Sequence, residues 1–157
     1  MTTIFLHGLE SSSRGTKAEW FRQHFPDMVI PDFVGTLTER MTDLNDLLAG
    51  KDNLVLIGSS FGGLMATIFA LENSERTNRV ILLAPALNYP EFEKYRGRST
   101  RVPARLYTGR LDTLCPPEKI IPLATEIFSN LTIHEADDDH LLRKTFPSIR
   151  WHELLSP

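Results

Sequence analysis

The sequence predicts an α/β fold in a single domain over residues 1–157: a doubly wound, mostly parallel sheet of about six strands with helices on both faces. Short apolar runs alternate with longer segments of helical periodicity. Strands that are apolar on both faces and separated by helices are typical of a parallel sheet covered on both sides. The length of 157 residues, with 41% hydrophobic and 24% charged residues, fits one globular domain.

The first half of the chain supplies three expected strands and two expected helices. Thr3–Leu6 is the first apolar run, and Gly15–Phe25 follows as a helix because its aromatic residues recur on one side. Met28–Ile30 is a second short run, which a proline ends. Thr36–Leu48 is expected to be a helix from its stripe of leucines, and Leu54–Ile57 is a fully apolar strand.

The second half continues the alternation, and prolines mark several of its boundaries. The expected elements are a helix at Phe61–Glu72, strands at Arg79–Ala84 and Ala104–Thr108, a helix at Pro117–Phe128, a strand at Leu131–Glu135 and a terminal helix after Leu141. The connection from Tyr89 to Arg101 is short, and it forms either a small flap over a pocket or a solvated loop.

Composition and charge exclude several classes of function. The formal net charge of −3 gives no basis for nucleic-acid binding, and no apolar run is long enough to span a membrane. The N-terminus lacks the features of a signal peptide, and the single cysteine, Cys115, excludes an internal disulfide, so we expect a cytoplasmic protein. No motif indicates a metal or a cofactor, and no phosphate-binding glycine loop follows the first strand, which disfavours a flavodoxin-like or nucleotide-binding domain.

The run Gly58-Ser59-Ser60-Phe61-Gly62 follows directly after the apolar strand Leu54–Ile57. A G-x-S-x-G sequence between a strand and a helix can hold a serine in a sharp, strained turn with its hydroxyl exposed. Glycine is needed on both sides because bulkier residues would collide there. The run therefore predicts that Ser60 is a nucleophile; the alternative is a serine that only caps the following helix.

A nucleophilic serine needs a base, and in parallel sheets such groups gather beyond the carboxyl ends of the strands. His140 follows the last expected strand and is the candidate base, which would later protonate the leaving group. Asp112 follows the preceding strand and would orient the imidazole of His140. The competing candidates are, for the acid, Asp137, Asp138 and Asp139, and, for the base, His24, His134 and His152.

Two backbone amides are expected to stabilise an oxyanion. One belongs to Phe61, the residue after the nucleophile, and the other to Leu9, in the loop after the first strand. Gly8 is expected to keep this loop close to the elbow without steric cost, and His7 to shape the loop.

Three other features have alternative interpretations. The segment Ser11–Lys17 is either an anion-binding start of a helix or a serine-capped helix with solvated basic residues. Asp32 either lines the pocket or fixes a turn. Cys115 is expected to be buried and not to act as a nucleophile.

Four patches together resemble the α/β-hydrolase superfamily: Leu6–Ser13, Gly58–Gly63, Gly109–Asp112 and His140. The His-Gly-x-x-Ser-Ser opening is most similar to the small YqiA-like bacterial esterases. The resemblance implies a minimal α/β-hydrolase core without a large cap, carboxylester or thioester hydrolysis through an acyl-enzyme, the triad Ser60, Asp112 and His140, and oxyanion amides from Leu9 and Phe61.

The sequence thus predicts a cofactor-free serine esterase whose partner is a small-molecule acyl substrate. Two alternatives remain open. One is an amidase or peptidase with the same triad, and the other is a binding protein that keeps the fold without the activity.

Overall fold

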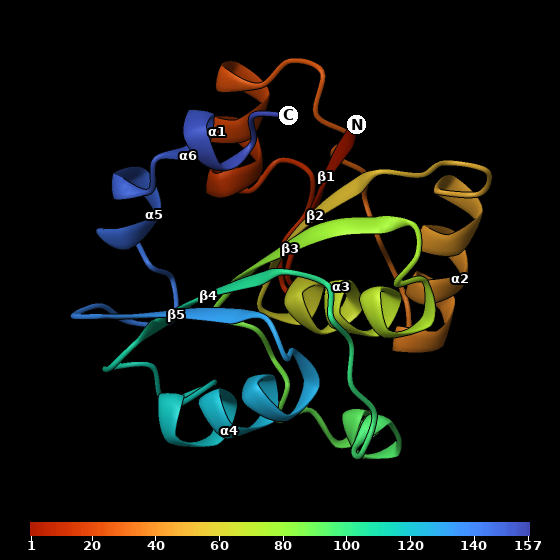
Figure 1. The fold of residues 1–157 in the computed structure, drawn as a ribbon. Coiled ribbons are helices and arrows are strands. Elements are labelled where there is room, and N and C mark those ends of the chain that lie inside the picture. The colour runs from red at the N-terminus through yellow and green to blue at the C-terminus, as the bar shows by residue number, and fades with distance from the viewer.

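The computed structural model describes residues 1–157, and it confirms the α/β prediction (Figure 1). Five parallel strands form one sheet in the order β1-β2-β3-β4-β5. The strands are β1 Thr2–Leu6, β2 Leu54–Ser59, β3 Thr77–Leu83, β4 Ala104–Gly109 and β5 Leu131–Ala136. The helices are α1 Thr16–His24, α2 Leu37–Leu47, α3 Phe61–Glu72, α4 Pro117–Ile127, α5 Thr145–Ser148 and α6 Trp151–Leu154, and Pro90–Tyr95 forms a 3₁₀ helix.

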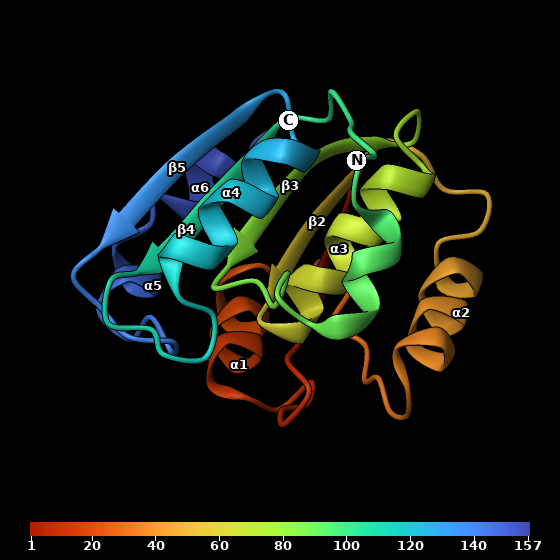
Figure 2. The ribbon, with the colours of Figure 1, turned by 90° about the horizontal axis from the view of Figure 1, so that it is seen from below.

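Helices cover both faces of the sheet, with α1, α5 and α6 on one side and α2, α3 and α4 on the other (Figures 1 and 2). Two hydrophobic cores result, one of 28 buried residues on the α2–α3–α4 side and one of 14 on the α1–α5–α6 side. The central helix α3 is apolar nearly all round, and its residues Phe61 to Ala70 are all buried. The helix that begins directly after Ser60 is therefore held in place by packing around nearly its whole circumference.

The segment Met28–Ile30 forms a single bridge and no strand of its own. Val29 pairs with Ile4 on the outer side of β1, where the Val29 amide donates to the Thr3 carbonyl at 2.9 Å and the Phe5 amide donates to the Val29 carbonyl at 3.0 Å. The pairing stops at Pro31, which has no N–H to donate. From this bridge at the outer side of β1 the chain returns through α2 to β2, which pairs with the other side of β1.

The expected terminal helix is broken into two short helices, α5 and α6. Ile149 separates them because its backbone is extended, with φ −68° and ψ 134°. This break lets both Phe146 and Trp151 enter the second core, where their rings lie 5.3 Å apart. None of the helices is both long and apolar enough to cross a membrane.

Candidate active site

Ser60 lies in a sharp turn between β2 and α3, with φ 54° and ψ −115°. Residues with a Cβ rarely adopt such a conformation, which costs about 1–3 kcal/mol and persists only where the surroundings enforce it. The Ser60 amide donates to the Leu83 carbonyl on β3 at 2.9 Å. A Cβ on Gly58 would collide with the backbone of Gly62, and a Cβ on Gly62 with the carbonyl of Leu6. The flanking glycines are therefore required by close backbone approach, as the sequence predicts.

The structure brings Ser60, His140 and Asp112 together in a continuous chain of hydrogen bonds. Nε2 of His140 lies 3.0 Å from Oγ of Ser60, and Nδ1 of His140 lies 2.7 Å from Oδ2 of Asp112. Asp112 and His140 lie in the loops after β4 and β5. The alternative histidines are occupied elsewhere: His24 stacks on Trp20, His134 stacks on Tyr107, and the ring of His152 lies 4.7 Å from that of Phe25.

The carboxylate of Asp112 is held in one orientation. Its side chain is completely buried, whereas that of His140 is 17% exposed. The other carboxylate oxygen, Oδ1, accepts hydrogen bonds from the amides of Leu114 at 2.9 Å and Cys115 at 2.8 Å. Only Oδ2 is left to face His140. This hydrogen-bond geometry favours the tautomer with its proton on Nδ1, which leaves Nε2 to accept from the serine hydroxyl.

Cys115 is buried beside this group, and burial, reinforced by the negative charge of Asp112, raises the pKa of its thiol to about 12. The potential ligand atoms of Asp112, Cys115 and His140 lie within 4.8 Å of one another, a spacing at which a metal could bind. A thiol with this pKa does not supply a thiolate ligand or nucleophile at neutral pH. The donor set therefore fits a hydrogen-bonded relay better than a metal site.

The three aspartates before His140 do not compete with Asp112. Asp138 is buried, and its Oδ2 accepts hydrogen bonds from the amides of Lys144 and Thr145 and from the Thr145 hydroxyl, all at 2.8 to 3.0 Å. Burial alone would raise the pKa of Asp138, but these bonds and one from the amide of Asp139 outweigh it and hold the pKa below its ordinary value. Asp138 thus anchors the loop that carries His140, a role that the sequence analysis missed.

The loop after β1 is fixed by His7. Nε2 of this buried histidine accepts from the Phe33 amide at 2.9 Å, and Nδ1 lies 2.7 Å from the Gly8 carbonyl, to which it donates. The Leu9 amide makes no hydrogen bond inside the chain. A Cβ on Gly8 would lie 3.5 Å from Cβ of Ser60, which is ordinary contact. The proximity of the loop to the elbow therefore does not itself require glycine, contrary to our expectation.

The segment Ser11–Lys17 is not a serine-capped helix. The residue before α1 is Gly15, and no side chain caps the helix. Ser13 instead donates hydrogen bonds to Asp32 from its backbone amide, at 2.7 Å, and from its hydroxyl, at 2.9 Å. The hydrogen bond from the amide is the largest cause of the lowered pKa of the Asp32 carboxyl. Asp32 therefore ties two loops together. Nζ of Lys17 donates to the Leu141 carbonyl at 2.7 Å, which links α1 to the loop of His140.

A pocket of about 690 Å³ opens in front of Ser60. Its wall is formed by residues from four loops, among them Leu9, Tyr89, Leu114, His140 and Leu141. The segment Tyr89–Arg101 begins with the 3₁₀ helix, whose Phe92 and Tyr95 are buried in the larger core. Tyr89 and Pro90 therefore form an anchored wall of the pocket, whereas Arg96–Ser99 continues as an exposed loop outside it.

The parallel sheet and the strained serine turn after β2 define the class of the protein, an α/β hydrolase. A family model described as serine aminopeptidase, S33, matches residues 7–153, and the chain belongs to this family. A search among curated proteins finds no match.

Solved structures with the same fold differ widely from the chain in sequence. Alpha/beta hydrolase domain-containing protein 10 from mouse has a TM-score of 0.79 at 18% identity, covering 99% of this chain and 90% of its own. Est1E from Butyrivibrio proteoclasticus, solved with ferulic acid bound, has a TM-score of 0.78 at 15% identity over 98% and 88%. A monoacylglycerol lipase from Paleococcus ferrophilus has a TM-score of 0.70 at 16% identity over 88% and 85%.

Proposed function

We propose that this hydrolase cleaves a carboxylester or thioester through an acyl-enzyme, with Ser60 as nucleophile, His140 as general base and acid, and Asp112 as the orienting acid. The observation that carries the proposal is the hydrogen-bond chain from Oγ of Ser60 through His140 to the buried carboxylate of Asp112, at 3.0 and 2.7 Å. Ser60, at the end of this series of hydrogen bonds, lines a pocket large enough for a small organic substrate. The closer resemblance to the small YqiA-like esterases remains a prediction.

In the first step, Oγ of Ser60 attacks the substrate carbonyl while Nε2 of His140 takes the hydroxyl proton. The negative charge of Asp112 stabilises the imidazolium that forms. His140 then gives the proton to the leaving oxygen or sulfur, and the acyl group stays on Ser60. In the second step, a water molecule loses its proton to His140, attacks the acyl-enzyme and releases the acid.

The amides of Leu9 and Phe61 are the donors for the oxyanion in this proposal. Phe61 is the first residue of α3, so its N–H has no partner within the helix and gains from the helix dipole. The Leu9 N–H is also free of partners inside the chain. Both residues adjoin the elbow: Phe61 is the next residue, and Leu9 lines the same pocket as Ser60.

Replacing Leu9 by proline tests this assignment, because proline removes the N–H and leaves the rest of the loop connected. Loss of one oxyanion donor is expected to lower kcat by about 100- to 1000-fold. Leu9→Ala keeps the N–H and is the matched control, with kcat expected to remain within a few-fold of the wild type. Both variants are checked for an unchanged Tm. A folded Leu9→Pro variant as active as Leu9→Ala would remove this amide from the mechanism.

An apolar substrate moiety is favoured by the mouth of the pocket. Leu9, Leu114 and Leu141 line it and are 43%, 67% and 46% exposed. Large exposed apolar side chains grouped around one opening commonly mark a binding site. Two of the similar structures, Est1E with ferulic acid bound and the monoacylglycerol lipase from Paleococcus ferrophilus, are consistent with an ester that carries an apolar group.

The description of the family, serine aminopeptidase, is the one observation in favour of the peptidase alternative. An aminopeptidase must bind the protonated amine of its substrate, which requires negative charge in the pocket. Glu10 is the one carboxylate that lines this pocket, and the cation Lys17 lines it as well. This charge balance favours the ester over the peptide.

Two measurements together test the proposed function. A fluorophosphonate probe is expected to label the folded protein once per chain, with the adduct on the peptide that contains Ser60. The ester p-nitrophenyl butyrate is expected to be cleaved at least 100-fold faster than alanine p-nitroanilide, because an amine is the poorer leaving group. Absence of labelling would favour the binding protein without activity. Labelling combined with faster cleavage of the anilide would favour the peptidase.

A further inference from the structure

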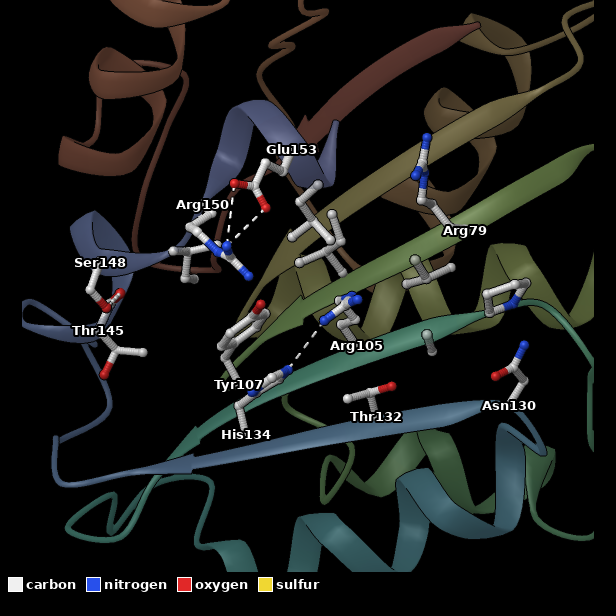
Figure 3. A pocket seen from close by; sticks show the side chains of 16 residues that line it. Arg79, Arg105, Tyr107, Asn130, Thr132, His134, Thr145, Ser148, Arg150 and Glu153 are labelled. Carbon is white, nitrogen blue, oxygen red and sulfur yellow. Dashed lines mark hydrogen bonds and ion pairs between the residues drawn. The ribbon is translucent and has the colours of Figure 1, made fainter. Parts of the chain in front are cut away.

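A second cavity, of about 700 Å³, lies on the opposite side of the sheet from α3. Its floor is the face of β3, β4 and β5, and its wall is formed by α5 and α6 (Figure 3). The residues that line it do not include Ser60, Asp112 or His140. We call this cavity the sheet groove.

The sheet groove exists because the helices on this side are short. α5 and α6 have four residues each, so the face of β4 and β5 is left partly open. In a parallel sheet, a face covered by helices is apolar. Here the part over β4 and β5 is polar, with Arg105 in register with Thr132 and Tyr107 with His134, whereas Ile81 on β3 belongs to the second core.

Three guanidinium groups from three different elements surround the sheet groove: Arg79 from β3, Arg105 from β4 and Arg150, next to α6. Glu153 is the only carboxylate in the lining, and it pairs with Arg150 at 3.2 Å. The groove thus carries two uncompensated positive charges in a chain whose formal net charge is −3. Excess charge of one sign in a hollow attracts ligands of the opposite sign.

The guanidinium groups retain unused donor capacity. Arg79 is partly engaged, because its Nη2 donates to the Ser156 carbonyl at 2.7 Å and lies 3.5 Å from Sδ of Met1, and its Nε is buried away from the groove. Arg105 has a long contact, 3.4 Å from its Nη1 to Nε2 of His134, and it also interacts with the hydroxyl of Tyr107. Figure 3 shows Arg105 in the middle of the floor, beside the parallel rings of Tyr107 and His134. A guanidinium offers a planar fork of donors that matches phosphate and carboxylate groups.

We propose that the sheet groove, with Arg79, Arg105 and Arg150, binds a small organic polyanion, a molecule that carries two or more phosphate or carboxylate groups. The volume of about 700 Å³ exceeds what a single inorganic anion fills and lies in the range of small-molecule sites. The positions of the guanidinium groups on two strands and at α6 suit a ligand with separated charges. The hydroxyl of Thr132 and the amide of Asn130 extend the polar lining at one end.

Pyrophosphate and citrate are the probes, one for each type of anionic group. Binding is measured by calorimetry at a constant ionic strength of about 0.15 M, where screening over about 8 Å suppresses nonspecific attraction. Saturable binding of either probe at one site per chain is expected. Arg105→Gln removes the charge while leaving a shorter polar side chain, and it is expected to raise the Kd about tenfold or more. Arg98→Gln is the matched control, because Arg98 is exposed and lies outside the groove, and its Kd is expected to equal that of the wild type.

Ser60→Ala is expected to bind the probes as the wild type does, which separates this proposal from the proposed hydrolase function. Three results would overturn it: no saturation with either probe, equal weakening by Arg105→Gln and Arg98→Gln, or tighter binding of an oligoglutamate peptide than of both probes, which would assign the groove to an acidic protein segment. Because Arg105 is exposed, its replacement is not expected to prevent folding, and an unchanged Tm verifies this.

Discussion

Replacing Ser60 by alanine is expected to lower kcat/KM for an ester substrate by about 10⁶-fold, the scale seen when a serine nucleophile is removed. Oγ of Ser60 is the hydrogen-bond partner of Nε2 of His140, at 3.0 Å, so its loss removes both the proposed nucleophile and the proton that His140 would take. Some acceleration over water should survive, because the oxyanion amides and the pocket remain. The measurement is hydrolysis of p-nitrophenyl butyrate by purified protein.

Ser74→Ala is the matched control. Ser74 is exposed in the turn between α3 and β3, at the opposite end of the strands from Ser60. Its variant should keep the activity and the Tm of the wild type. If folded Ser60→Ala retained more than about one hundredth of the activity, the nucleophile would be another residue. The labelled peptide would then identify it.

The strands and helices were largely predictable, because the apolar runs and the helical stripes are local signals. The exceptions depend on contacts between distant segments. Met28–Ile30 has the composition of a strand, yet Pro31 limits it to one bridge with β1. The segment after Leu141 has helical character, but both Phe146 and Trp151 must reach the second core, and the helix breaks between them.

In the candidate site, the residues that could be predicted are those identified by a local sequence pattern. The glycines beside Ser60 are such a marker, and the strand-end positions of Asp112 and His140 are another. The anchors of these loops carry no such marker. Asp138 binds Thr145 seven residues later, and Ser13 binds Asp32 across 19 positions, so both partners are decided by the path of the loops.

Asp112 also shows how the structure adds to the sequence. The order of residues suggests an acid that orients His140. It does not reveal the two backbone amides that donate to the carboxylate and hold it in one orientation. These amides bind Oδ1 and leave Oδ2 for His140. This fixed orientation determines the effect expected when Asp112 is replaced by asparagine, which is neutral and of equal size.

Asp112→Asn is expected to lower kcat/KM by about 10⁴-fold, as expected when the orienting acid of a serine–histidine pair becomes an amide. The amides of Leu114 and Cys115 are donors, so the asparagine must turn its carbonyl oxygen toward them. Its NH₂ group then faces Nδ1 of His140 and donates to it. The proton of the imidazole moves to Nε2, and that nitrogen can no longer accept the proton of Ser60.

Two observations distinguish this tautomer effect from a general loss of structure or of charge. The ¹⁵N chemical shifts of His140 should report the proton on Nδ1 in the wild type and on Nε2 in Asp112→Asn. Asp137→Asn removes the same charge from an exposed position in the loop of His140, and its activity should stay within a few-fold of the wild type. If Asp112→Asn kept its proton on Nδ1, or if Asp137→Asn lost as much activity, then negative charge near the histidine, and not the geometry at Asp112, would be the property that supports catalysis.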